Sequence, residues 1–155
     1  MKKKRTILFM IALSAVLGVF LAFFLINPLV YSNNQKLKQA VMSVKSDTVS
    51  LNETVPFTWD AVYTFAPYIT KNEIEKIIGF KSNSIQETVN DGMIQLVFIK
   101  GSKVVSSICG YSEDLGYNIY FPIKEGNYYS KIDFKENPVF SVMRVDDVVK
   151  LTYIE

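Results

Sequence analysis

Residues 93–110 read MIQLVFIKGSKVVSSICG, and this stretch decides the fold that the sequence predicts. Two largely apolar runs, Met93–Lys100 and Lys103–Gly110, flank Gly101-Ser102, a two-residue loop that suits the primed turn of a β-hairpin. The register that follows from this loop pairs Phe98 with Val105, Leu96 with Ser107, Ile94 with Cys109 and Ile99 with Val104. Both faces of the hairpin are largely apolar, so we expect it to be central in a sheet.

The residues before the hairpin predict a strand and a short helix. Phe57–Tyr68 is rich in aromatic and β-branched residues and contains a proline at its end, as expected of a strand that stops there. Thr70 and Glu73 have the spacing of a capping box, and Gly79 suits the left-handed position that follows a last helical turn. We therefore predict a helix of about two turns between Thr70 and Gly79.

Turn residues on both sides of the hairpin predict further strands. Asn90-Asp91-Gly92 indicates a turn, which makes Ser84–Val89 a neighbouring strand. Asn118–Pro122 and Tyr128–Phe134 flank a turn at Lys124-Glu125-Gly126-Asn127, and we expect these two strands to pair with each other.

The C-terminal residues are rich in β-branched types and predict a last hairpin that turns at Asp146-Asp147. This turn pairs Val142 with Leu151 and Phe140 with Tyr153. A helix that begins at Pro138 is the alternative, because a turn without glycine or asparagine is a weaker signal. The fold class that we predict is α+β: an N-terminal transmembrane helix, followed by a small domain with a mainly antiparallel β-sheet of about six strands and a short capped helix.

An uncharged apolar segment precedes this domain. Ile7–Ile26 contains Ser14 as its single polar residue, and at about 1.5 Å per residue a helix of this length crosses a hydrocarbon core of about 30 Å. A cleaved signal peptide is the alternative, but its apolar region is shorter and ends in a small-x-small site, whereas this segment continues into Asn27-Pro28. We therefore predict a transmembrane helix in residues 7–30, with the lipid bilayer as a partner.

The charge distribution predicts the orientation of this helix. Lys2–Arg5 hold four of the 17 basic residues, and basic residues beside a span stay in the cytoplasm. We predict a single-pass protein of the cell membrane with a cytoplasmic basic tail at 1–6 and the C-terminal domain outside. The rest of the chain then holds 13 basic against 15 acidic residues, which does not suit a nucleic-acid partner.

The segment between the membrane and the domain has a helical pattern. Leu37, Ala40, Val41 and Val44 recur at the spacing of one helix face. Residues 31–50 are therefore either an amphipathic helix that docks on the domain or a simple stalk, and we place the extracytoplasmic α+β domain at 51–155.

The residues with reactive side chains argue against an enzyme. The chain has no histidine, which removes the commonest general base and metal ligand. Cys109 is the single cysteine, and we expect a small buried hydrophobe rather than a nucleophile because no cation is predicted beside it. Asp146-Asp147 and Glu113-Asp114 suit solvated turns better than a calcium loop, and an acid/base pair of Asp60 and Glu73 would have no nucleophile. We predict no catalytic residue, no metal and no cofactor.

Two groups of residues suggest binding instead. The first combines tyrosine rings with carboxylates, a composition that gives large contact area at low entropic cost; its members are Tyr111, Tyr117, Tyr120, Tyr128, Tyr129, Glu113 and Asp114. The alternative is that these tyrosines pack on the sheet with their hydroxyls in water. The second is a small-residue stripe at Ser14, Gly18 and Ala22, which permits close approach of another transmembrane helix.

The stretch WDAVYTFAPY at residues 59–68, the helix that ends at Ile77-Ile78-Gly79 and the strand Leu96-Val97-Phe98 resemble small membrane-anchored or lipoprotein-like extracytoplasmic proteins of Gram-positive bacteria. The resemblance covers about residues 56–110 and implies an extracytoplasmic location, without catalytic residues to transfer. This chain lacks the lipidated cysteine of the lipoprotein members.

From these patterns we expect a membrane-tethered, non-enzymatic binding protein at the outer face of the cytoplasmic membrane. Its partner would be another protein of the membrane or cell envelope, and an immunity or inhibitor protein against a toxin or envelope enzyme is one form. The alternative is an accessory subunit of a membrane complex, recruited partly through its transmembrane helix.

Overall fold

The structure, a computed structural model, describes residues 10, 13, 14, 18 and 27–154. Most of the predicted transmembrane segment at 7–30 lies outside these residues. In the part of the chain that is described, no helix is both long and apolar enough to cross a membrane.

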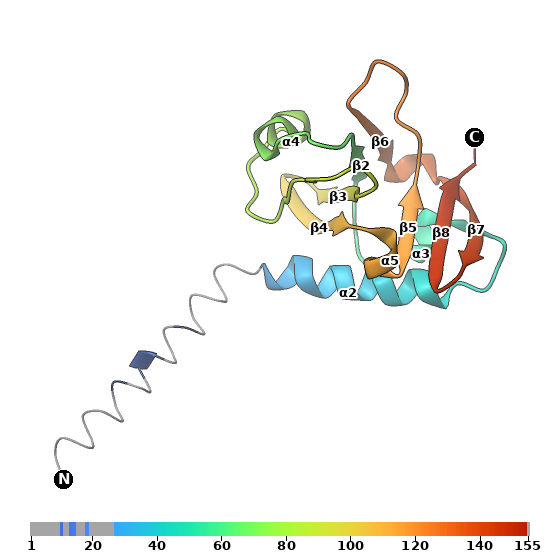
Figure 1. Ribbon diagram of the computed structural model, residues 1–155, viewed down its shortest axis with the longest axis horizontal. Helices are drawn as coiled ribbons and strands as arrows, with labels where there is room; N and C mark the ends of the chain where they lie inside the picture. Colours follow the sequence, from blue (N-terminus) through green and yellow to red (C-terminus); the bar gives the residue numbers. More distant parts are fainter. Residues whose placement is uncertain (1–9, 11–12, 15–17, 19–26, 155) are drawn as a thin grey trace, which may run out of the picture.

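Two four-stranded sheets pack face to face (Figure 1). Sheet A has the strand order β1 (Thr48–Ser50), β7 (Val139–Val145), β8 (Val148–Tyr153) and β5 (Tyr117–Tyr120). Sheet B has the order β4 (Lys103–Gly110), β3 (Ile94–Lys100), β2 (Ala61–Phe65) and β6 (Tyr129–Asp133). All neighbours are antiparallel except β5 and β8, which run parallel. The predicted α+β class with antiparallel-rich sheets is confirmed, whereas the single sheet of about six strands is wrong.

A β-bulge changes the register of the β3–β4 hairpin. Next to the Gly101-Ser102 turn the pairing is as predicted, with Ile99 opposite Val104. Between Phe98 and Ile99 the register shifts by one residue, and Phe98 lies opposite Ser106, Leu96 opposite Ile108 and Gln95 opposite Cys109. The extra residue in β4 lets Val105 and Ile108, which are three apart, both face the core between the sheets. The predicted pairs beyond the turn were therefore wrong.

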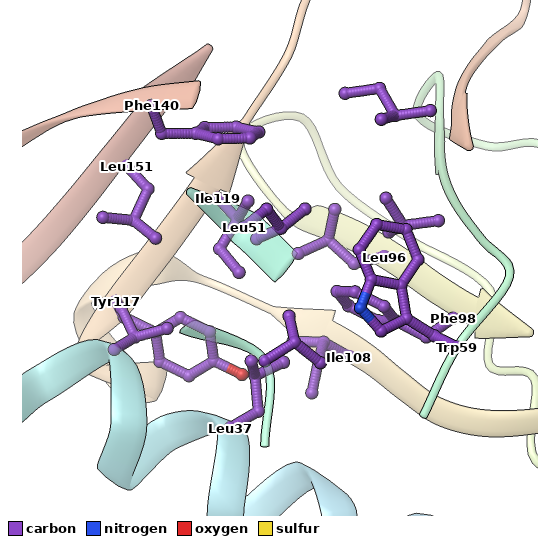
Figure 2. Packing of buried hydrophobic residues seen from close by; sticks show 14 of the residues in the cluster. Leu37, Leu51, Trp59, Leu96, Phe98, Ile108, Tyr117, Ile119, Phe140 and Leu151 are labelled. Carbon is purple, nitrogen blue, oxygen red and sulfur yellow. The ribbon is translucent and has the colours of Figure 1, made fainter. Parts of the chain in front are cut away.

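The main hydrophobic core lies between the two sheets (Figure 2). Leu96 and Phe98 face it from sheet B, and Ile119, Phe140 and Leu151 face it from sheet A. Two short helices, α3 (Leu51–Thr54) and α5 (Ser112–Leu115), and a 3-10 turn at Phe134–Glu136 connect the strands around it.

A second core covers the other face of sheet B. Helix α4 (Lys71–Ile78) packs Ile74 and Ile78 there against residues of β2 and β3. The predicted cap is confirmed, because Thr70 and Glu73 form a capping box and Gly79 is left-handed with φ of 88°. Sheet B is therefore the central layer of the domain.

Helix α2 (Pro28–Ser43) docks along the edge of sheet B, below both sheets in Figure 1. It begins after the N-cap Asn27, and Leu37 and Val41 are fully buried in the main core. Asn34 uses its side-chain amide as a strand would use its backbone: Nδ2 donates to the Ser107 carbonyl at 2.8 Å, and Oδ1 accepts from the Ser107 N–H at 3.1 Å. Asn33 Nδ2 donates to the Val105 carbonyl at 2.8 Å. The amphipathic helix therefore docks rather than forming a stalk.

Two predicted strand pairings differ from the structure. Strands β5 and β6 lie in different sheets, although the turn between them forms, with the Asn127 N–H donating to the Lys124 carbonyl at 3.0 Å. Pro122 lacks an N–H and Phe121 is buried in the core, so the chain leaves sheet A before this turn and cannot close a hairpin. Residues 84–89 form no strand, and contacts such as Tyr68 N–H to Thr88 Oγ1 at 3.1 Å hold them instead.

The C-terminal hairpin is confirmed, with Val142 opposite Leu151 and Phe140 opposite Tyr153. Its turn places Asp146 in the left-handed region at φ of 52°, which a short polar side chain tolerates. The alternative of a helix beginning at Pro138 is wrong.

Candidate binding site

The structure separates the tyrosines that the sequence grouped together. Tyr117 is 1% exposed and belongs to the main core, where Figure 2 shows its ring beside Leu37 and Ile108, so it cannot form part of a binding surface. Burial raises its pKa. The sequence held the signal for this, because Tyr117, Ile119 and Phe121 alternate with polar or exposed residues and all three face the core.

The remaining members of the group lie in three places. Tyr120 is 54% exposed and lines a pocket of about 480 Å³ between the β2–β3 region and the β5–β6 connection. Tyr111, Glu113 and Asp114 lie at α5, where Asp114 lines a separate pocket beside α2. Two pairs from the predicted set each share a pocket: Asp114 and the buried Tyr117 line the pocket beside α2, and Tyr128 and Tyr129 line another, in which both rings are exposed.

This pocket, which we call the tyrosine pocket, has a volume of about 520 Å³. It is lined by residues 66–69 after β2, by Glu73, Lys76 and Ile77 of α4, and by residues 126–129 before and at the start of β6. Tyr128 is 73% exposed, and Tyr68, which sequence reasoning missed, is 58% exposed at the same pocket. Three tyrosine rings from two segments far apart in the sequence therefore gather around one apolar hollow.

Tyr68 is held in an unusual backbone conformation. Its φ is 66°, in the left-handed region that a bulky side chain rarely adopts and that costs of the order of 1 kcal/mol. The buried Thr88 holds it there by accepting the Tyr68 N–H at 3.1 Å. Because Thr88 is 20 residues away in sequence, no local pattern could have revealed this conformation.

The Tyr129 ring packs against an aromatic cluster on β2. Tyr63 and Phe65 of β2 are stacked with ring centroids 6.0 Å apart, and the Tyr129 ring lies 6.2 Å from the first and 6.3 Å from the second. Tyr63 and Phe65 are buried, and desolvation by burial is the main cause that raises the pKa of Tyr63. On this side of the pocket, the Tyr129 ring is thus packed against two buried rings.

The pocket is lined by two charged residues, Glu73 and Lys76. The Glu73 carboxylate accepts from Thr70 Oγ1 at 2.6 Å and from the Thr70 N–H at 2.9 Å, and these bonds lower its pKa. Lys76 lowers the pKa of Glu73 further through its charge. Since the two charged lining residues have opposite signs, the pocket presents tyrosine rings and apolar surface without a net charge.

The other candidate residues have local structural contacts. Asp60 accepts from Lys100 Nζ at 2.5 Å and from the Gly101 N–H at 2.7 Å, so it fastens the β3–β4 turn, and these bonds lower its pKa. Cys109 lies opposite Gln95 and is half-buried rather than in the core; burial raises its pKa, and its thiol lies 3.7 Å from the Glu87 carbonyl. Among residues 27–154 and the few described before them, no cluster of acidic, cysteine or histidine side chains could hold a metal.

The predicted contact stripe of the transmembrane helix lies only partly within the described residues. Ser14 and Gly18 are helical and exposed, and Ala22 lies outside the described residues.

Comparison with protein-family models, with curated proteins and with solved structures found no match to this chain.

Proposed function

We propose that this chain is a membrane-tethered binding protein that captures a partner protein through the tyrosine pocket at the outer face of the cytoplasmic membrane. The observation that carries the proposal is the convergence of Tyr68, Tyr128 and Tyr129 on one hollow whose two charged lining residues have opposite signs. Exposed aromatic rings around a pocket are the usual anchors of protein interfaces, and rings fixed before binding lose little entropy.

The membrane part of the proposal rests on the apolar segment Ile7–Ile26 and on the basic block Lys2–Arg5. A tether suits a protein that must meet its target at the lipid surface. An immunity or inhibitor protein that protects the cell from a toxin or envelope enzyme would act in this place, and we retain it as the specific form of the proposal.

The test compares single variants of the full-length protein in a mild detergent. The wild type, Tyr68→Ala and Tyr128→Ala are used to capture membrane and envelope proteins, which are quantified by mass spectrometry. Because a ring at the centre of an interface contributes about 2 kcal/mol or more, each variant should lower capture of the true partner at least about tenfold.

Tyr120→Ala is the matched control. This tyrosine is 54% exposed, close to Tyr68 at 58%, and it lines the adjoining pocket but not the tyrosine pocket, so its loss should leave capture unchanged. If Tyr68→Ala and Tyr128→Ala captured the partner as efficiently as the wild type does, the tyrosine pocket would not be the binding site.

The variant Gly18→Leu distinguishes the alternative function, an accessory subunit of a membrane complex, from binding through the tyrosine pocket. No described atom lies within 4 Å of a Cβ built at Gly18, so the substitution leaves the described domain intact. It should abolish capture if the transmembrane stripe recruits the chain to a complex, and it should leave capture unchanged if the tyrosine pocket does so.

A further inference from the structure

The two outer edges of sheet B are treated differently. At the β4 edge, the side chains of Asn33 and Asn34 in α2 form hydrogen bonds with backbone groups of Val105 and Ser107. These backbone groups could otherwise pair with another strand. At the opposite edge, β6 pairs with β2 and with no other strand in the described part of the chain. Sheet B therefore has one edge that α2 covers at Val105 and Ser107 and one open edge.

The hydrogen-bonding pattern shows which groups the open edge presents. The Ala66 N–H donates to the Tyr128 carbonyl at 2.8 Å, and the Phe134 N–H donates to the Asp60 carbonyl at 2.8 Å. Even-numbered residues of β6 therefore direct their backbone groups toward β2, and the odd-numbered residues direct theirs outward. The outward N–H of Asp133 donates to Glu136 Oε1 at 2.7 Å, whereas the outward N–H and C=O groups of Tyr129 and Lys131 have no hydrogen-bond partner among the described residues.

These free backbone groups lie beside the tyrosine pocket. Tyr129 is the first residue of β6 and also lines the pocket, so the open edge begins where the hollow ends. A lysine on an exposed edge strand commonly prevents another strand from pairing there. Lys131, however, forms an ion pair with Asp133 of its own strand, with Nζ and Oδ1 2.7 Å apart.

We propose that the partner presents an extended peptide segment, which adds to sheet B as a strand beside β6 and places an uncharged apolar side chain in the tyrosine pocket. The inference rests on the proposed function and specifies its binding mode. Backbone donors and acceptors that recur every second residue fit an extended backbone and not a helix, whose backbone groups are bonded internally. The cancelling charges of Glu73 and Lys76 favour an apolar side chain over a charged one.

The probe is a library of seven-residue peptides displayed on phage and selected against the full-length protein in a mild detergent. We expect enriched peptides with apolar residues at alternate positions. The selected peptide is then resynthesised with single N-methyl groups, and methylation at every second residue should weaken binding about tenfold or more, because it removes the N–H groups that face β6. Methylation at the intervening residues should have little effect.

The protein side is tested by Lys131→Pro, with Lys131→Ala as its matched control. Both variants remove the lysine side chain, but only proline removes the outward N–H, and it does so on an edge strand where proline is tolerated. Peptide affinity should fall about tenfold in the proline variant and stay near the wild-type value in the alanine variant. Trp59, which is buried in the core, reports by its fluorescence whether each variant is folded. If the proline variant does not fold, the N-methyl series still decides.

Amide hydrogen exchange provides the direct readout. Without peptide, the Ser130 and Ile132 amides should be protected by β2, and those of Tyr129 and Lys131 should exchange freely. With peptide, the second pair should become at least about tenfold more protected.

The outcomes separate the two proposals. A peptide whose affinity falls in Tyr128→Ala without added protection at Tyr129 and Lys131 refutes strand addition and keeps the pocket. Peptides that bind equally well to Tyr128→Ala refute both proposals. If the library yields no binding peptide, strand addition is refuted. The capture experiment with folded partners then tests the tyrosine pocket by itself.

Discussion

The hydrogen bonds that hold α2 to β4 predict how much stability the protein loses when one asparagine of this helix is replaced. Asn34 makes three hydrogen bonds with β4: with the Ser107 carbonyl at 2.8 Å, with the Ser107 N–H at 3.1 Å and with Ser106 Oγ at 2.7 Å. Asn34→Ala removes all three and leaves the Ser107 backbone at a half-buried edge. At about 1 kcal/mol for each bond, less about 0.5 kcal/mol because alanine favours the helix, the loss of unfolding free energy should be about 2.5 kcal/mol.

The assay is urea unfolding of the full-length protein in a nonionic detergent, followed by the fluorescence of Trp59. This residue is the single tryptophan and is 2% exposed, so its emission reports the integrity of the core. For a urea slope of about 2 kcal/mol per molar, the midpoint should fall by about 1.2 M.

Gln39→Ala is the matched control, since Gln39 lies on the same helix and is exposed. It should change stability by less than about 0.5 kcal/mol. If Asn34→Ala were no more destabilising than Gln39→Ala, the amides of α2 would not hold the helix to the sheet, and the apolar face alone would account for docking.

Three further predictions concern single residues and use the same unfolding assay. Tyr117→Phe should stabilise the protein by about 1 kcal/mol, because the buried hydroxyl has no hydrogen-bond partner among the described residues; a loss of stability would mean that water satisfies it. Gly79→Ala should cost about 1 kcal/mol from its φ of 88° alone, since no described atom beyond the adjacent chain lies within 4 Å of the added Cβ; an unchanged midpoint would contradict this. Glu73 has a lowered pKa, so its stabilising effect is fully present above its ordinary value of 4.5 and disappears as the pH falls through the lowered value. The decrease in the urea midpoint between pH 7 and pH 3 should therefore be smaller in Glu73→Gln than in the wild type, and equal decreases would refute the role of the capping box.

Features that neighbouring residues determine were predictable from the sequence. The capping box of Thr70 and Glu73 needs only their spacing and the apolar face that follows. The pairing of Phe140 with Tyr153 follows once the turn at Asp146-Asp147 is assumed, because antiparallel register propagates from the turn. In both cases the determining contacts span few residues.

Features that depend on distant segments were not predictable. The bulge in β4 arises because Val105 and Ile108 must both reach a core whose other wall comes from sheet A. The parallel pairing of β5 with β8 joins segments about thirty residues apart, and no local turn specifies it. The left-handed Tyr68, which completes the tyrosine pocket, depends on Thr88.

The energetics of α2 connect the fold to the proposed function. Val30, Leu37 and Val41 are buried, and at about 2–3 kcal/mol for each side chain their burial contributes about 6–9 kcal/mol before the entropy cost of ordering the helix. This burial term is of the same order as the net stability of a typical domain, about 5–15 kcal/mol. The helix therefore belongs to the folded core, and residues 31–50 contain most of α2 and all of β1 rather than a flexible spacer. If Ile7–Ile26 spans the bilayer as its sequence predicts, Asn27 is the only residue between that span and a rigid domain with a radius of gyration of roughly 14 Å. A partner of the tyrosine pocket must then come within a few tens of ångströms of the lipid surface, which favours an integral or membrane-bound protein over one that diffuses freely.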